Sequence, residues 1–211
     1  MHLRTLHRLW ALVLLIFVGA HVTNHLVSAI GIQKHIEFMN AARFVYRAPI
    51  VETLLLFCVT YQILSGIWFV ASGWRNRSGT VAWIQACSGI YIAFFLLVHV
   101  GAVLYGRAVL DLDTNCFYAA AGMHVPPNQY FFVPYYFLSL VALSAHLGCA
   151  LYWRLKTSSH SVRRAALIVP VLLGSAASSV IVLSLAGKLQ PLEIPAKYKA
   201  TYAKDGGVAW R

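Results

Sequence analysis

One histidine lies deep inside a long uncharged stretch of the chain. The stretch runs from Trp83 to Tyr105 and contains His99. As a helix it would be about 34 Å long, enough to cross a bilayer. An imidazole in hydrocarbon is costly, so it usually faces the interior of a bundle and has a polar partner. Histidines inside other apolar runs could supply that partner, and these are His21, His25 and His146.

Two neutral imidazoles on facing helices at one depth could hold a haem iron from both sides. The alternative is that these histidines bond to hydroxyl or carbonyl groups and hold no metal. His25 lies one turn from His21 and could be the ligand in its place, or could bond to a haem propionate. Small residues would leave room for a flat macrocycle, although they also promote ordinary helix packing. They are Gly19, Gly66, Ser88 and Gly89.

Composition places the chain among integral membrane proteins. Hydrophobic residues make up 60% of it and charged residues 11%, which is too apolar for a soluble domain. The net charge is +11, but the Lys and Arg residues lie between apolar runs. They are therefore expected to orient helices and to contact anionic lipid or a partner subunit, and nucleic acid is not an expected partner. The four cysteines show no C-x-x-C spacing, which argues against a disulfide framework or a thiolate metal site.

We expect an all-α membrane protein with five transmembrane helices, the first four forming a haem-binding bundle. The spans are expected at about Leu9 to Ile30, Ile50 to Ala71, Val81 to Tyr105, Phe131 to Trp153 and Ala165 to Ala186. The transmembrane domain then covers residues 1–186, and residues 187–211 form an extramembrane tail. The long loop from Gly106 to Tyr130 could cap an outer haem, while the tail could fold over the bundle or bind a partner.

The Lys and Arg residues of the short loops predict a cytoplasmic N terminus. Eight lie on the N-terminal side of the membrane and four on the opposite side, and positive charge favours the cytoplasmic side. With five spans the C terminus lies outside, and a bacterial inner membrane is the expected location. The eight are Arg4, Arg8, Arg75, Arg77, Arg154, Lys156, Arg163 and Arg164; the four are Lys34, Arg43, Arg47 and Arg107.

This topology gives each histidine a depth. His21, His25 and His99 share a level in the outer half of the bundle, and His146 lies nearer the cytoplasmic face. The polar residue of the second span nearest that inner level is Gln62. The remaining histidines lie at span ends or in loops, where solvated or interfacial side chains are expected. They are His2, His7, His35, His124 and His160.

Four motifs, one in each of the first four spans, resemble those of a known family. They are GAHVTNHL followed by Gly31, then YQILSGIW, SGIYIAFFLLVH and AHLGCALYW. The resemblance covers about residues 7–153 and rests on spacing more than on identity. The family is the single-chain, five-helix cytochrome b subunit of succinate:quinone oxidoreductases, a group that includes fumarate reductases.

The resemblance implies two stacked b haems. The outer one would be held by His21 and His99, and the inner one by His146 and a histidine of the second helix. Gln62 stands where the family has that histidine, and glutamine is a poor iron ligand. A single outer haem is therefore the leading expectation, with two possible. The motifs imply that Gly66, Ser88, Gly89, His25 and Gln62 lie against the cofactors.

The resemblance also implies that the chain anchors a flavoprotein and an iron–sulfur protein and exchanges electrons with quinone. The chain has no flavin fingerprint and no cysteine cluster, so it would be a non-catalytic subunit. The candidates for quinone binding are Glu52 at the outer start of the second span, Tyr61 with Gln62 in its middle, and His7, Arg8 and Trp10 at the inner end of the first span. Two alternatives stay open, namely a haem-free anchor or assembly subunit of such a complex, and a stand-alone membrane protein.

Overall fold

Five long helices dominate the computed structural model, which describes residues 2–202. They are α1 (Leu3–Val27), α3 (Pro49–Ser72), α4 (Thr80–Ala108), α6 (Gln129–Arg154) and α7 (His160–Leu185). Each is long and apolar enough to cross a membrane. The expected all-α fold with five transmembrane helices is confirmed, and the chain is an integral membrane protein by this criterion.

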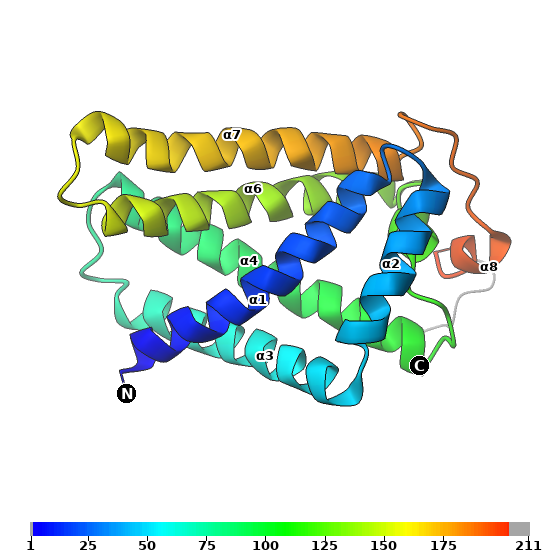
Figure 1. The fold of residues 1–211 in the computed structure, drawn as a ribbon, viewed down its shortest axis with the longest axis horizontal. Helices are drawn as coiled ribbons and strands as arrows, with labels where there is room; N and C mark the ends of the chain where they lie inside the picture. Colours follow the sequence, from blue (N-terminus) through cyan, green and yellow to red (C-terminus); the bar gives the residue numbers. More distant parts are fainter. Residues whose placement is uncertain (1, 203–211) are drawn as a thin grey trace.

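Three shorter helices were not predicted from the sequence. They are α2 (Ile32–Tyr46), α5 (Cys116–Ala121) and α8 (Ala196–Lys199). All three lie at the end of the bundle opposite the start of α1 (Figure 1). The sequence analysis treated residues 32–46 as a loop because they carry no continuous apolar run.

The long helices form a closed ring of contacts. α1 packs on α3, α3 on α4, α4 on α6 and α6 on α7, and α7 returns to contact α1. In Figure 1, α1 runs obliquely across the bundle, from the end of α3 near the N terminus to the far end of α7. Because α1 and α4 each pack on α3 but on different further neighbours, they face one another across the bundle.

Local sequence explains where several helices begin. Pro49 occupies the first turn of α3, where its missing N–H costs nothing and its fixed φ suits a helix. The side chain of Asn115 accepts from the backbone N–H groups of Phe117 (2.9 Å) and Tyr118 (3.4 Å) at the start of α5. Gly79 has φ +84° before α4, a conformation that a side chain would strain.

Small residues allow α6 and α7 to pack closely. A Cβ built on Gly148 would lie 3.0 Å from the backbone oxygen of Leu167. Ser178 of α7 donates a hydrogen bond of 2.8 Å to the carbonyl of Phe137 in α6. Small side chains and hydroxyl bonds of this kind hold membrane helices together where burial of apolar surface contributes little.

The loop after α4 and the chain after α7 together close one end of the bundle. Tyr198 of α8 is 2% exposed, and its hydroxyl accepts from Asn115 Nδ2 at 3.1 Å. His124 Nε2 donates to the carbonyl of Leu185 at 2.8 Å. Residues 187–202 thus fold over the bundle, which was one of the two expectations for the tail. Residues 203–211 lie outside the described part of the chain.

The tight contact at Gly148 gives a test of the α6–α7 packing. We expect Gly148→Ala to destabilise the protein by about 1–3 kcal/mol because the new methyl group meets backbone atoms that have no rotamer to change. Gly101→Ala is the matched control, since a Cβ there meets nothing within 4 Å. Thermal unfolding in detergent should show a lower midpoint for Gly148→Ala only. Equal midpoints for the two variants would contradict the packing described.

Candidate functional site

His21 of α1 and His99 of α4 lie opposite one another within the bundle. Their ring centroids are 6.0 Å apart and their planes are inclined by 68°. A metal bound to two imidazole nitrogens at about 2 Å each would place the ring centroids about 6 Å apart. Within residues 2–202, neither ring makes a hydrogen bond. The two residues therefore have the separation and the uncommitted nitrogens that a shared metal ion requires.

A cavity of about 150 Å³ lies between these two histidines and the closed end of the bundle. The loop after α4 contributes Cys116 and Tyr118 to its wall, and the chain after α8 contributes Tyr202. The loop that was expected to cap an outer haem therefore does line the space beside His21 and His99. Aromatic rings complete the site, with Phe95 stacked on His99 at 5.0 Å and Phe17 stacked on His21 at 5.6 Å.

Two further histidines extend the pair into a row. His25 lies 4.7 Å from His21, and His35 of α2 lies 5.2 Å from His25, measured between ring centroids. His25 Nδ1 is buried and has no hydrogen-bond partner among the described residues. Such an atom is suited to a ligand group or water, because a buried polar atom without a partner is costly.

His35 was misplaced by the sequence analysis. It was expected to be solvated or interfacial, but it is 1% exposed, and its Nδ1 donates to the carbonyl of Asn24 at 2.7 Å. Burial lowers the pKa of His35 below its ordinary value of 6.5, against the smaller opposing effect of that bond. The sequence contains no direct signal for the burial of His35, because α2 has no continuous apolar run.

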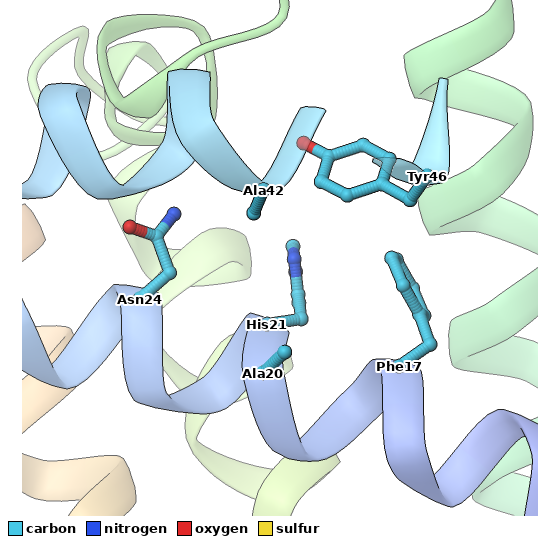
Figure 2. A pocket seen from close by; sticks show the side chains of 6 residues that line it. All are labelled: Phe17, Ala20, His21, Asn24, Ala42 and Tyr46. Carbon is cyan, nitrogen blue, oxygen red and sulfur yellow. The ribbon is translucent and has the colours of Figure 1, made fainter. Parts of the chain in front are cut away.

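A smaller cavity lies on another side of His21. Its volume is about 20 Å³, roughly that of one water molecule. Figure 2 shows the ring of His21 extending from α1 toward α2, with Asn24 on one side and Phe17 on the other. Asn24 Oδ1 is buried without a partner within residues 2–202. A water molecule here could bond to Asn24 and His21 together.

The residues expected at the inner haem, Gln62 and His146, each make hydrogen bonds within the described chain. Gln62 donates from Nε2 to the backbone carbonyl of His7 at 2.7 Å, so it ties α3 to α1. His146 Nδ1 lies 3.1 Å from the carbonyl of Gln85 and 3.3 Å from the Ser88 hydroxyl. The side chain that meets Ser65 and Gly66 of α3 is that of His7.

Gly66, Ser88 and Gly89 all lie at this inner level. A Cβ on Gly66 would lie 3.9 Å from the His7 ring, and one on Gly89 would lie 3.2 Å from the His146 ring. Ser88 precedes His99 by eleven positions, or about 16 Å along a helix. These small residues therefore make room for imidazoles at the inner level and do not contact the outer pair.

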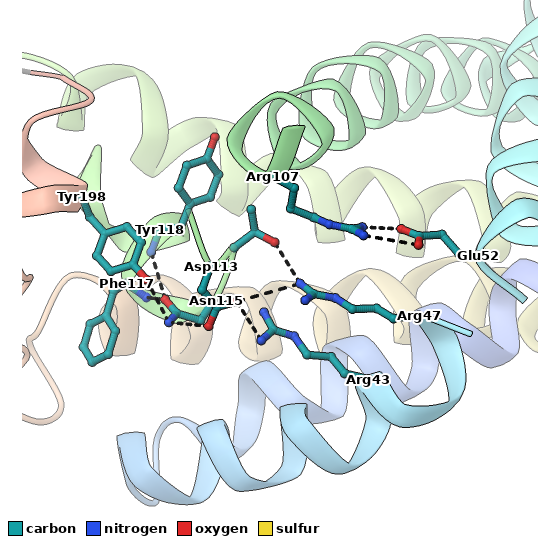
Figure 3. A network of polar contacts seen from close by, with 10 residues as sticks. Arg43, Arg47, Glu52, Arg107, Asp113, Asn115, Phe117, Tyr118 and Tyr198 are labelled. Carbon is teal, nitrogen blue, oxygen red and sulfur yellow. Dashed lines mark hydrogen bonds and ion pairs between the residues drawn. The ribbon is translucent and has the colours of Figure 1, made fainter. Parts of the chain in front are cut away.

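Ion pairs tie the outer helix ends to the loop after α4 (Figure 3). Glu52 of α3 pairs with Arg107 of α4. Asp113 in the loop pairs with Arg43 at 2.8 Å, and Arg47 donates to Thr114 at 3.1 Å. The acid that was a candidate for quinone chemistry thus joins two helices. The hydroxyl of the other candidate, Tyr61, is buried without a partner in the described chain.

The comparisons with known proteins identify no relative, because no family model, curated protein or solved structure matches the chain. Among the described residues, no group of three or more His, Cys, Asp or Glu side chains is placed to hold a metal ion. A haem needs only axial ligands, because the macrocycle supplies the remaining four bonds to iron. The geometry of the histidines is therefore the feature of this chain that bears on its function.

The buried His35 predicts that α2 loosens in acid. Because its folded-state pKa is below 6.5, its contribution to stability is complete above that pH and is lost as the pH falls toward the folded-state pKa. Amide hydrogen exchange of α2 should therefore accelerate below about pH 6.5, beyond the change in intrinsic rate. His35→Gln should show a weaker acceleration, and His160→Gln, at an exposed helix start, should match the wild type. Acceleration of the same size in His35→Gln would rule out this role for His35.

Cys116 tests whether the loop after α4 and the chain after α7 close the outer end of the bundle. Burial raises the pKa of its thiol to about 12, and the residue is 1% exposed. In detergent-purified protein with Cys58, Cys87 and Cys149 changed to Ala, Cys116 should resist a hydrophilic maleimide at pH 8 until the protein is denatured. Thr157→Cys, made in that background with Cys116→Ala, is the accessible control, because Thr157 lies in an exposed loop. Equally fast labelling of the two folded proteins would show that this end of the bundle is open.

Proposed function

We propose that the chain is the haem b-containing membrane anchor of a complex like succinate dehydrogenase or fumarate reductase. In this role it transfers electrons between soluble flavin and iron–sulfur subunits and a membrane quinone. The observation that carries the proposal is the pairing of His21 and His99 across the bundle, with centroids 6.0 Å apart, beside a lined cavity. The sequence motifs resembling the cytochrome b family support the same role.

The residues present fit a haem between α1 and α4. His21 and His99 would be its axial ligands, and both rings lack competing hydrogen bonds within residues 2–202. The unpartnered Nδ1 of His25 suits a hydrogen bond to a polar group of the macrocycle. When bound, the haem would supply reversible one-electron transfer by its iron. The protein would hold it in a dry, aromatic site, which controls its redox potential.

Arginines at the start of the bundle suit the docking of a soluble partner. Arg75 and Arg164 are exposed. Arg77 instead stacks over Trp83 at 5.3 Å, and Arg163 stacks over Tyr152 at 4.1 Å. The first two are therefore available to an acidic surface, and the stacked pair are occupied within the chain. We infer that this end is cytoplasmic, in agreement with the excess of positive charge there.

The optical spectrum of the purified protein tests the haem. We expect at least one b haem per chain in the dithionite-reduced minus oxidised spectrum, quantified by pyridine haemochrome. His99→Ala should lose one equivalent because iron loses an axial ligand, and His160→Ala should retain the wild-type content. Absence of haem from freshly prepared membranes would contradict the proposal and favour the haem-free anchor.

Purification in mild detergent tests the partner assignment. A tagged chain should retain flavin and iron–sulfur subunits, and the double substitution Arg75→Glu with Arg164→Glu should reduce their recovery several-fold. Lys34→Glu with Lys188→Glu, two exposed lysines at the opposite end of the bundle, is the control for charge reversal. Recovery of haem without any redox partner would instead favour a stand-alone membrane cytochrome.

A further inference from the structure

A phenylalanine stacks on each of the two imidazoles at the candidate haem site. Phe17 lies on His21 with ring centroids 5.6 Å apart and planes inclined by 21°. Phe95 lies on His99 at 5.0 Å and 13°. In both cases the phenylalanine precedes the histidine by four positions on the same helix, which places the two side chains on one face, one turn apart. The same arrangement therefore occurs in α1 and in α4.

A second ring meets each imidazole almost at right angles. His25 lies 4.7 Å from His21 with planes inclined by 84°, and Tyr136 of α6 lies 6.4 Å from His99, also at 84°. The torsion that turns a histidine ring about its Cβ–Cγ bond is broad by itself. A parallel neighbour and a perpendicular neighbour restrict it, because turning the ring would break both contacts. The packing thus fixes the plane of each imidazole as well as its position.

The two phenylalanines are themselves held by tyrosines of other helices. Phe17 meets Tyr46 of α2 at 5.4 Å with planes inclined by 75°, and Figure 2 shows this pair beside His21. Phe95 packs on Tyr135 of α6 at 4.8 Å, and Tyr135 is 4% exposed. α2 and α6 therefore act on the imidazole planes through the phenylalanines.

The planes of His21 and His99 are inclined to one another by 68°. Two imidazoles on the iron of an unhindered haem turn toward parallel planes, because this splits the two π-type d orbitals and stabilises low-spin ferric iron. Strongly inclined planes leave these orbitals close in energy, so the ferric form is less favoured and the midpoint potential is higher. A protein must hold the rings to keep them inclined.

We propose that Phe17 and Phe95 are positioning residues that hold His21 and His99 in inclined planes and thereby raise the midpoint potential of the haem between them. The inference rests on the proposed function, in which both histidines are axial ligands. Each phenylalanine acts through the imidazole on which it stacks.

Electron paramagnetic resonance tests this role, because the ferric signal reports the inclination of the ligand planes. The parent protein is His146→Ala, and it should give a highly anisotropic low-spin signal. Phe17→Leu and Phe95→Leu should each retain the haem content of the parent. Their signals should be rhombic, with a smaller largest g value, since the released imidazole turns toward the plane of its partner. Redox titration should show a lower midpoint potential in both variants.

Two control variants separate stacking from a general effect on the bundle. Phe94→Leu makes the same change beside Phe95, at a position that is 45% exposed and whose ring contacts tyrosines. It should leave the signal and the potential unchanged. Phe17→Tyr keeps the stacked ring, and the cavity of about 20 Å³ that Phe17 lines has room for a hydroxyl group. This variant should keep the parent signal.

The failures of the two proposals give different results. Leu variants with the spectrum and potential of the parent would overturn the role of the phenylalanines and leave the haem assignment intact. Changes as large in Phe94→Leu as in Phe95→Leu, or in Phe17→Tyr as in Phe17→Leu, would show that the stacked rings are not the cause. Absence of haem from the parent would overturn this inference together with the proposed function.

Discussion

The cost of placing an imidazole inside a membrane-spanning bundle is the constraint on which this structure depends. A ring nitrogen that cannot reach water needs a hydrogen bond or a metal. The buried His35 and His146 each meet this need at Nδ1, through the carbonyls of Asn24 and Gln85 respectively. His21 and His99 meet none of it within residues 2–202, although they face one another at metal-sharing distance. A metal between them would satisfy one nitrogen of each ring.

The other helices and loops are arranged so that they enclose His21 and His99. α1 crosses the bundle obliquely (Figure 1), so it packs on α3 and reaches α7, and its outer half places His21 beside His99 of α4. The loop after α4, α8 and α2 cover the outer end. The ion pair Asp113–Arg43 joins the loop to α2 within this cover, and Glu52–Arg107 joins α3 to α4 beneath it.

The five spans could be predicted from sequence because a long apolar run has few alternatives to a transmembrane helix. The pairing of His21 with His99 was also accessible, since both lie in the outer halves of spans that run in the same direction. These inferences needed only length, hydropathy and loop charge. The structure brings the two residues together as the depth argument expected, while their ligand role stays a prediction.

The features that could not be predicted from the sequence depend on tertiary contacts. α2 and α8 are short and partly polar, and they are stabilised by packing on the bundle, which no local pattern encodes. The depth of each residue in the membrane was also estimated on the assumption that the helices stand perpendicular to the membrane. The tilt of α1 (Figure 1) brings His7 to Ser65 of α3, whereas counting residues from the membrane surface placed His7 at the interface. Gln62 kept the expected place in sequence, but its side chain bonds to a backbone carbonyl instead of reaching His146.

The most direct test of the central claim is the low-temperature electron paramagnetic resonance spectrum of the oxidised protein. It is best recorded on His146→Ala, so that only the outer pair of histidines can hold a haem iron from both sides. Iron held between two imidazoles whose planes are inclined by 68° should give a highly anisotropic low-spin ferric signal. A high-spin ferric signal alone, or no haem signal, would show that His21 and His99 do not share an iron atom.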